Sequence, residues 1–125
     1  MDASVKERYK SLFGYVPEKI QHRYQLAEMA GHPESLEAIE NYRKVLIEEN
    51  PLEAKYQQLV HFALLIGARE IYPAQLHAVG ALKAGATVKE LYGVCETAAI
   101  TGGMPAFTLA IECVTKAIKT INNNP

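Results

Sequence analysis

The stretch LVHFALLIGAREIYPAQLHAVGALKAG, residues 59–85, decides the fold of this chain. Apolar residues fill both halves, and Gly67-Ala68-Arg69 at the centre predicts a turn between two helices. His61 lies eight residues before Arg69 and His77 lies eight residues after it, so an antiparallel hairpin places both histidines at the same height. Two imidazoles inside an apolar hairpin are costly unless they form hydrogen bonds or take part in chemistry. The hairpin is therefore the candidate site.

The remainder of the chain predicts helices as well. Apolar residues at helical spacing, bounded by glycine or proline, predict seven helices, at about residues 3–13, 17–30, 33–47, 51–66, 72–84, 87–101 and 105–121. Asn50 is expected to cap the fourth helix, and Thr87-Val88-Lys89-Glu90 has the pattern of a capping box that opens the sixth. We find no segment of strict two-residue alternation. The sequence predicts an all-α bundle of about six to seven helices, forming a single domain over residues 1–125.

The apolar content predicts self-association. The segment LVHFALLI, residues 59–66, is apolar nearly all round, which predicts burial on every side. The fifth to seventh predicted helices are rich in alanine and glycine, which let helices approach closely. Since the apolar surface is large for seven short helices, we expect a homo-oligomer in which neighbouring subunits complete the core.

Composition excludes several classes of function. The chain has 125 residues and a formal charge of -1, without a clustered basic face, so a nucleic-acid partner is not expected. The longest charge-free stretch, Thr97 to Ile111, is broken by glycine and proline and is shorter than a membrane span. Charges near the N-terminus occupy the place of a signal peptide's apolar core. We therefore expect a cytoplasmic protein that does not enter the membrane.

The remaining titratable groups do not predict a metal or a disulfide. His61, His77 and Glu70 lack the spacing of a metal-binding motif, so neither a metal nor a cofactor is expected. Cys95 and Cys113 lie nine residues on either side of Met104, which places them close together in a second hairpin. Their apolar surroundings predict protonated packing residues, with a redox pair as the alternative.

The segment QLHAVGALKAGATVKELYGVCETAAITGGMPAF, residues 75–107, resembles the carboxymuconolactone decarboxylase family, which includes alkylhydroperoxidase-D-like proteins. A histidine is followed by a small-residue helix, an alanine-glycine stop, a Thr-x-x-Glu cap and a helix that ends in Gly-Gly-x-Pro-Ala. The resemblance covers about residues 51–113, whereas residues 1–50 share only helical character. It implies an alkylhydroperoxidase-D-like bundle that assembles as a homotrimer or homohexamer.

The resemblance implies two candidate chemistries. In the decarboxylase branch, which removes carbon dioxide from a carboxylated muconolactone, His77 matches the active-site histidine, and Gln75 stands where a glutamate is frequent. In the peroxidase branch, a Cys-x-x-Cys precedes the histidine and a glutamate on the previous helix joins a proton relay. Glu70, Pro73 and Gln58 occupy those three positions here. Thiol peroxidase activity is therefore not expected.

We expect a decarboxylase or lyase that acts on a small carboxylated lactone or a related acid, with His77 as general acid or base. His61 is the second catalytic candidate because it lies on the same helical face as Gln58. Arg69 is the nearest cation for the substrate's carboxylate. The candidate substrate-binding residues are Gln58, Arg69, Glu70, Tyr72 and Gln75. Two alternatives stay open: a peroxidase relative that has lost its thiol pair, and a non-catalytic oligomeric ligand-binding protein in which the histidines are structural.

Overall fold

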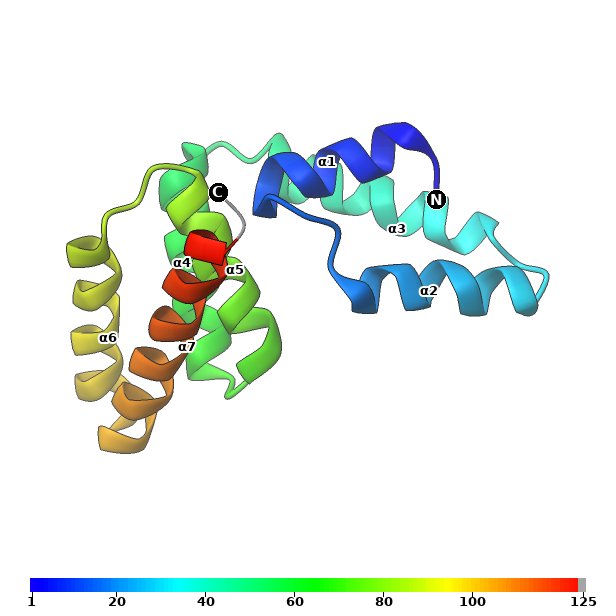
Figure 1. Ribbon diagram of the computed structural model, residues 1–125. Helices are drawn as coiled ribbons and strands as arrows, with labels where there is room; N and C mark the ends of the chain where they lie inside the picture. Colours follow the sequence, from blue (N-terminus) through cyan, green and yellow to red (C-terminus); the bar gives the residue numbers. More distant parts are fainter. Residues whose placement is uncertain (124–125) are drawn as a thin grey trace. The chain divides into compact units, whose positions relative to one another are not determined.

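The computed structural model describes residues 1–123, and within that range the chain is helical without strands (Figure 1). The all-α prediction is confirmed. The elements are α1 (Ala3–Phe13), α2 (Glu18–Met29), α3 (Glu34–Arg43), a π-helical turn (Lys44–Glu48), α4 (Ala54–Gly67), α5 (Ile71–Lys83), α6 (Val88–Gly102) and α7 (Met104–Asn123).

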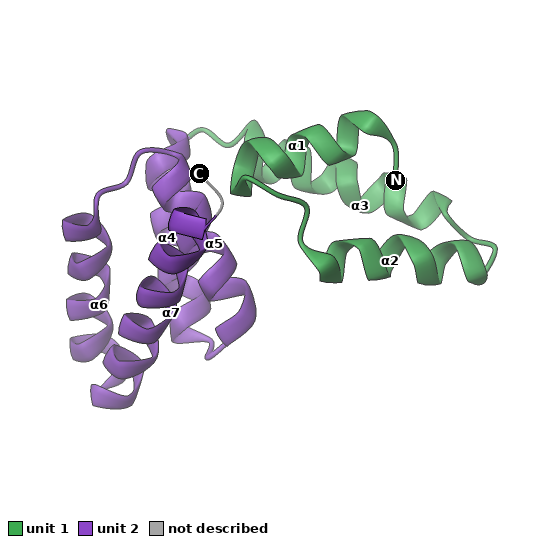
Figure 2. Cartoon of the chain, viewed as in Figure 1, with its two compact units in different colours: residues 1–51 green, residues 52–125 purple. Residues whose placement is uncertain are grey.

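The chain divides into two compact units, Met1–Pro51 and Leu52–Pro125 (Figure 2). The second unit contains both candidate histidines. Because the division reflects the density of contacts and not independent folding, the single-domain organisation remains a prediction.

In the first unit, α1 has the bounds that the sequence predicts. The carboxylate of Asp2 accepts a hydrogen bond from the Val5 backbone N–H and caps the helix, and Gly14 ends it with a left-handed φ of 87°. The side chains of Val5, Tyr9 and Phe13 form its buried stripe. Helix α1 thus follows from a local apolar period together with two local boundary signals.

The third predicted helix is correct in position but wrong in detail. It leaves the α-helical pattern after Arg43 and continues as the π-helical turn. The Asn50 side-chain amide donates to the Leu46 carbonyl at 2.9 Å. It therefore closes this turn and does not cap the following helix, so α4 begins only at Ala54. The capping role that we expected for Asn50 is wrong, because its amide bonds backwards along the chain.

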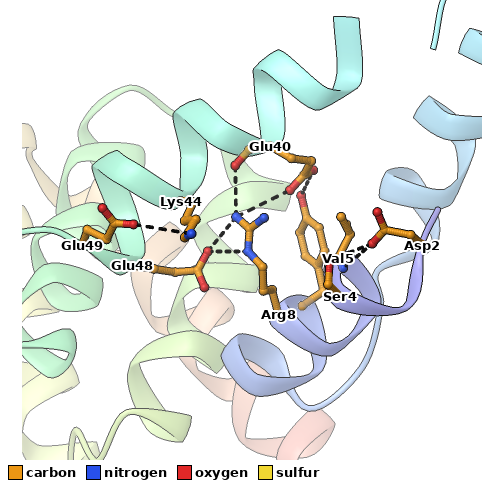
Figure 3. A network of polar contacts seen from close by, with 9 residues as sticks. Asp2, Ser4, Val5, Arg8, Glu40, Lys44, Glu48 and Glu49 are labelled. Atoms are coloured by element: carbon orange, nitrogen blue, oxygen red, sulfur yellow. Dashed lines mark hydrogen bonds and ion pairs between the residues drawn. The ribbon is translucent and has the colours of Figure 1, made fainter. Parts of the chain in front are cut away.

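A buried polar network holds α1 to α3 within the first unit (Figure 3). The Tyr9 hydroxyl donates to the Glu40 carboxylate at 2.6 Å, and both residues are buried. Burial, together with this hydrogen bond, raises the pKa of Tyr9 well above its ordinary value. The Arg8 guanidinium donates to the Glu48 carboxylate at 2.8 Å and to the Glu40 carbonyl oxygen at 3.0 Å. Polar contacts therefore join α1 to α3 and to the π-helical turn.

The second unit consists of two helical hairpins, α4–α5 and α6–α7. Helix α4 packs against α6, and α5 packs against α7. At the start of α4 and α6, the Lys55 ammonium lies 3.2 Å from the Glu90 carboxylate. Beyond the end of α4, the Arg69 guanidinium donates to the Gly102 carbonyl at 3.1 Å, at the end of α6. The two helices therefore run parallel and are joined at both ends.

The predicted boundaries inside this unit agree well with the structure. Thr87 and Glu90 form the predicted capping box, in which each side chain accepts from the other residue's backbone N–H. The predicted burial of α4 on every side is wrong for the chain by itself. Phe62 and Ile66 are fully buried, but Leu64 on the opposite face is 68% exposed. The spacing of apolar residues along a helix shows that a face of the helix is apolar, but it does not show what covers that face.

Candidate functional site

The α4–α5 hairpin brings His61 and His77 into direct contact. Their ring centroids are 3.6 Å apart and the ring planes are tilted by 33°. The two rings lie at the same height along the hairpin, as their equal spacing from Arg69 predicts. His77 is only 4% exposed, whereas His61 is half-buried. The two imidazoles thus share one site, with His77 as its inner member and His61 as its outer member.

Gln58, which lies one turn before His61 on α4, is the third polar residue of the site. Its side-chain carbonyl oxygen lies 2.8 Å from His77 Nδ1, and Gln58 is 2% exposed. A carboxamide oxygen can only accept a hydrogen bond, so this contact places a proton on Nδ1 and leaves the lone pair of the neutral ring on Nε2. Gln58 therefore contacts the inner histidine directly, whereas the sequence assigned it to substrate binding.

Small residues surround His77 on α5. Ala74, Ala78 and Ala81 are fully buried, and Gly80 is also buried. Because these side chains have little bulk, α5 can approach α4 and α7 closely and bring the imidazole of His77 into the bundle. The family-like small-residue pattern of this helix therefore has a direct packing role next to the candidate site.

The other predicted site residues lie toward the hairpin turn. Glu70 is exposed and stands just before α5, whereas Tyr72 is 40% exposed and Gln75 is half-buried on that helix. Arg69 has a left-handed φ of 61° and donates to the Gly102 carbonyl. At 1.5 Å per residue, Arg69 lies about 12 Å along the axis from His61. The structure groups Gln58 with the two histidines and places Arg69 beside the α6–α7 turn.

A cleft between α4 and α6 is a second feature of this unit, and the sequence does not indicate it. Its volume is about 680 Å³, which is within the range of small-molecule sites. The lining is mainly small and apolar, and neither histidine is among the described lining residues. Residues of the cleft include Ala63, Leu64, Val94, Ala98 and Ala106. Alanines and glycines spaced along two neighbouring helices are the only sequence signal for it.

The cysteines form a separate, apolar pair. Both thiols are free and buried, as their surroundings predict. Burial raises the pKa of Cys95 to about 11, and the neighbouring Cys113 contributes to this shift. Burial also raises the pKa of Cys113, whose sulfur contacts the Ile71 carbonyl oxygen at 3.8 Å. Such thiols remain protonated near neutral pH, which favours a packing role.

Residues 1–123 contain neither a cluster of metal-binding side chains nor a helix that could span a membrane. Histidine, cysteine and carboxylate side chains do not gather there in groups of three or more with a metal-binding arrangement. Helices in the same range lack the combination of length and hydropathy that a bilayer crossing requires.

Comparison with known proteins gives two matches. The model of the carboxymuconolactone decarboxylase family matches residues 33–116, which is more than half of the chain. Uncharacterized protein MJ1511 of Methanocaldococcus jannaschii is 29% identical over 82 residues, covering 66% of this chain and 77% of that protein. Both the hairpin with the two histidines and the α6–α7 turn lie inside the range of the family match.

Proposed function

Because the chain belongs to the carboxymuconolactone decarboxylase family, we propose that it is a decarboxylase-like lyase acting on a small carboxylated lactone or a related acid. The observation that supports this proposal best is the buried contact between Gln58 and His77, with His61 stacked on the same imidazole. An apolar hairpin tolerates three neighbouring polar side chains when they satisfy one another or serve chemistry.

His77 is proposed as the general acid or base. When a carboxylate leaves as carbon dioxide, its bonding electrons stay on the substrate and are delocalised into the adjacent carbonyl system. A proton must then be delivered to that system in place of the lost carboxylate, and an imidazole that has taken up a proton can deliver it near neutral pH. His61 is the more exposed member of the stacked pair, whereas His77 is buried. We therefore propose that His61 shares the catalytic role.

A carboxylated substrate also needs favourable electrostatics. Arg69 was the expected cation, but its guanidinium bonds to the Gly102 carbonyl at the other end of the hairpin. The closer source of positive charge is the histidine pair, which can carry a proton on His61. Tyr72 and Gln75, which precede His77 on α5, are proposed to contact the rest of the substrate.

We also propose that the protein assembles as a homotrimer or homohexamer. The support is the exposed apolar surface of the second unit, in which Leu64 is 68% and Ile100 is 90% exposed. Exposed residues of this kind mark association surfaces when they adjoin one another. Helix α4, apolar nearly all round, then gains on association the burial that it lacks in the isolated chain.

Carbon dioxide release from a panel of small carboxylated lactones and related unsaturated acids tests the catalytic proposal. His77→Ala is expected to lower the rate by a factor of about 100 or more, the usual contribution of a general acid or base. His22→Ala is the matched control, because His22 is exposed in the first unit and is expected to leave the rate unchanged. Equal turnover by the wild type and His77→Ala contradicts the proposal.

A non-catalytic ligand-binding function is the second candidate, and the cleft between α4 and α6 favours it. At about 680 Å³ the cleft suits an apolar small molecule, yet it does not include the histidines among its described lining residues. Binding of an apolar probe dye that is displaced by unmodified carboxylated lactones, without any turnover of them, would support this function. The thiol-peroxidase alternative lacks support, because Glu70 and Pro73 occupy the positions of its cysteines.

A further inference from the structure

We infer that Gln58 is a positioning residue, which holds His77 as the neutral tautomer with its proton on Nδ1, so that Nε2 is the basic atom. The tautomer follows from the contact itself. Only the catalytic use of Nε2 rests on the proposed function. This assignment replaces the substrate-binding role that the sequence suggested for Gln58.

The geometry of the contact carries the inference. Gln58 Oε1 and His77 Nδ1 are 2.8 Å apart, which is a normal length for an N–H···O hydrogen bond. Gln58 and His77 are 2% and 4% exposed, so water competes little for either group. The two residues come from different helices, and the contact therefore fixes the imidazole relative to α4. A hydrogen bond to one ring nitrogen determines which nitrogen carries the proton in the neutral ring.

The uncharged carboxamide of Gln58 determines how the contact affects the protonation of His77. A carboxylate at position 58 would carry a negative charge next to Nδ1 and would favour the imidazolium. The carboxamide of Gln58 offers the same acceptor geometry without the charge, so it orients the ring and does not stabilise its cation. The stacked His61 also disfavours the cation of His77, because a charge on His61 would repel a second charge on a ring whose centroid is 3.6 Å away. His77 therefore begins as a neutral ring, and its Nε2 must take up a proton before it can deliver one to the substrate.

Long-range proton–nitrogen NMR of protein labelled with ¹⁵N-histidine tests the inference without any substrate. In the wild type at neutral pH, His77 is expected to show a protonated Nδ1 and an unprotonated Nε2. In Gln58→Leu, which removes the acceptor, the proton is expected to redistribute onto Nε2. In Gln58→Glu, which restores the acceptor and adds a charge, Nδ1 is expected to stay protonated. His77 should then also take a proton on Nε2 at a higher pH than in the wild type.

Gln57→Glu is the matched control, since it adds the same charge on α4 one residue away from the contact. It is expected to leave the His77 tautomer unchanged and to shift its protonation less than Gln58→Glu does. A wild-type His77 with its proton on Nε2 would overturn the inference, and this result needs no variant to fold. An unchanged tautomer in folded Gln58→Leu, or equal effects of the two glutamates, would also overturn it.

Failure of the proposed function gives a different result. If the expected tautomers are seen but no carboxylated lactone is turned over, the positioning role of Gln58 stands and the lyase proposal fails. If turnover depends on His77 but the tautomer is the opposite one, the lyase proposal stands and the role of Gln58 is wrong.

Discussion

The imidazoles of His61 and His77 stack with their centroids 3.6 Å apart, although they come from different helices. The hairpin turn places them so, eight residues away on each side of Arg69. Two unit charges at about this distance repel by about 4 kcal/mol at an effective dielectric constant of about 20, and the partial exposure of His61 reduces this value. The pair is therefore expected to hold one proton far more readily than two.

This repulsion leads to the first prediction. His61→Phe keeps a ring over His77 and removes the second titratable imidazole, so the ring signals of His77 are expected to titrate in one step, without the two-step curve of a coupled pair. The pH dependence of the His77 ring signals in NMR measures the change. His22→Phe, at an exposed site in the first unit, should leave the titration of His77 where it is. An unchanged titration in His61→Phe would mean that the rings are not electrostatically coupled.

The second prediction concerns the thiols. Burial raises the pKa of Cys95 from 9.0 to about 11, so little reactive thiolate forms at pH 8. Both thiols are expected to resist iodoacetamide in the folded protein and to react in urea. The unfolded chain loses the Cys95 proton first as the pH rises, so this thiol should lower the stability of the fold between about pH 9 and pH 11. Rapid alkylation of the native protein at pH 8 is the contrary result.

The third prediction tests the buried network of the first unit. Tyr9→Phe removes the hydroxyl that donates to the Glu40 carboxylate at 2.6 Å and leaves that buried oxygen without this donor. The expected loss is about 1–3 kcal/mol in the free energy of unfolding, measured by urea denaturation. Tyr42→Phe is the control, because Tyr42 is 66% exposed and should change stability by less than about 0.5 kcal/mol. Equal effects of the two substitutions would show that the hydrogen bond between Tyr9 and Glu40 does not stabilise the fold.

The fourth prediction compares two glycines of α6. A Cβ added at Gly93 meets no atom within 4 Å, so Gly93→Ala is expected to stabilise the helix by about 0.5–1 kcal/mol. A Cβ added at Gly102 lies 2.9 Å from the Ala106 methyl carbon, which has no flexible end to move aside. Gly102→Ala is therefore expected to destabilise the fold by about 1–3 kcal/mol. Thermal unfolding measures both, and shifts of the same sign would contradict the comparison.

The fifth prediction concerns assembly. Ile100→Lys places a charge on a side chain that is 90% exposed in the isolated chain, so folding of one subunit should be little affected. If this face is covered in an oligomer, the buried charge is expected to reduce the mass found by sedimentation. Glu96→Lys, one turn earlier on α6, changes charge at an already polar site and serves as control. A wild type that sediments as a monomer would contradict the proposed trimer or hexamer.

Local patterns in the sequence predict most of the second unit. The turn lies where the sequence predicts it, although Arg69 and not Gly67 adopts the left-handed conformation, and the meeting of His61 and His77 follows from counting along the flanking helices. The Thr87–Glu90 capping box is equally local, because both partners lie within one helical turn. Features that depend on residues fewer than about ten positions apart, or on a single hairpin, could therefore be foreseen.

Other features depend on contacts for which the chain has no local signal. Tyr9 and Glu40 are 31 residues apart, and neither the aromatic residue nor the carboxylate indicates its partner. The Asn50 amide could cap the next helix or close the previous turn, and only packing decides between these bonds. The hydrogen bond from His77 to Gln58 depends on the rotation of each helix about its own axis, which spacing along the chain fixes only approximately.

The parallel arrangement of α4 and α6 has a consequence for anything that enters the cleft between them. Lys55 with Glu90 joins the helices at one end, and Arg69 with Gly102 joins them at the other. Splaying either end breaks one of these surface contacts, which hold the two helices side by side along the cleft. The side chains that line the cleft are already ordered by folding. A ligand therefore binds without a large further loss of their conformational entropy. The cleft also selects its ligand by shape, because a wider molecule enters only if one of these two contacts breaks.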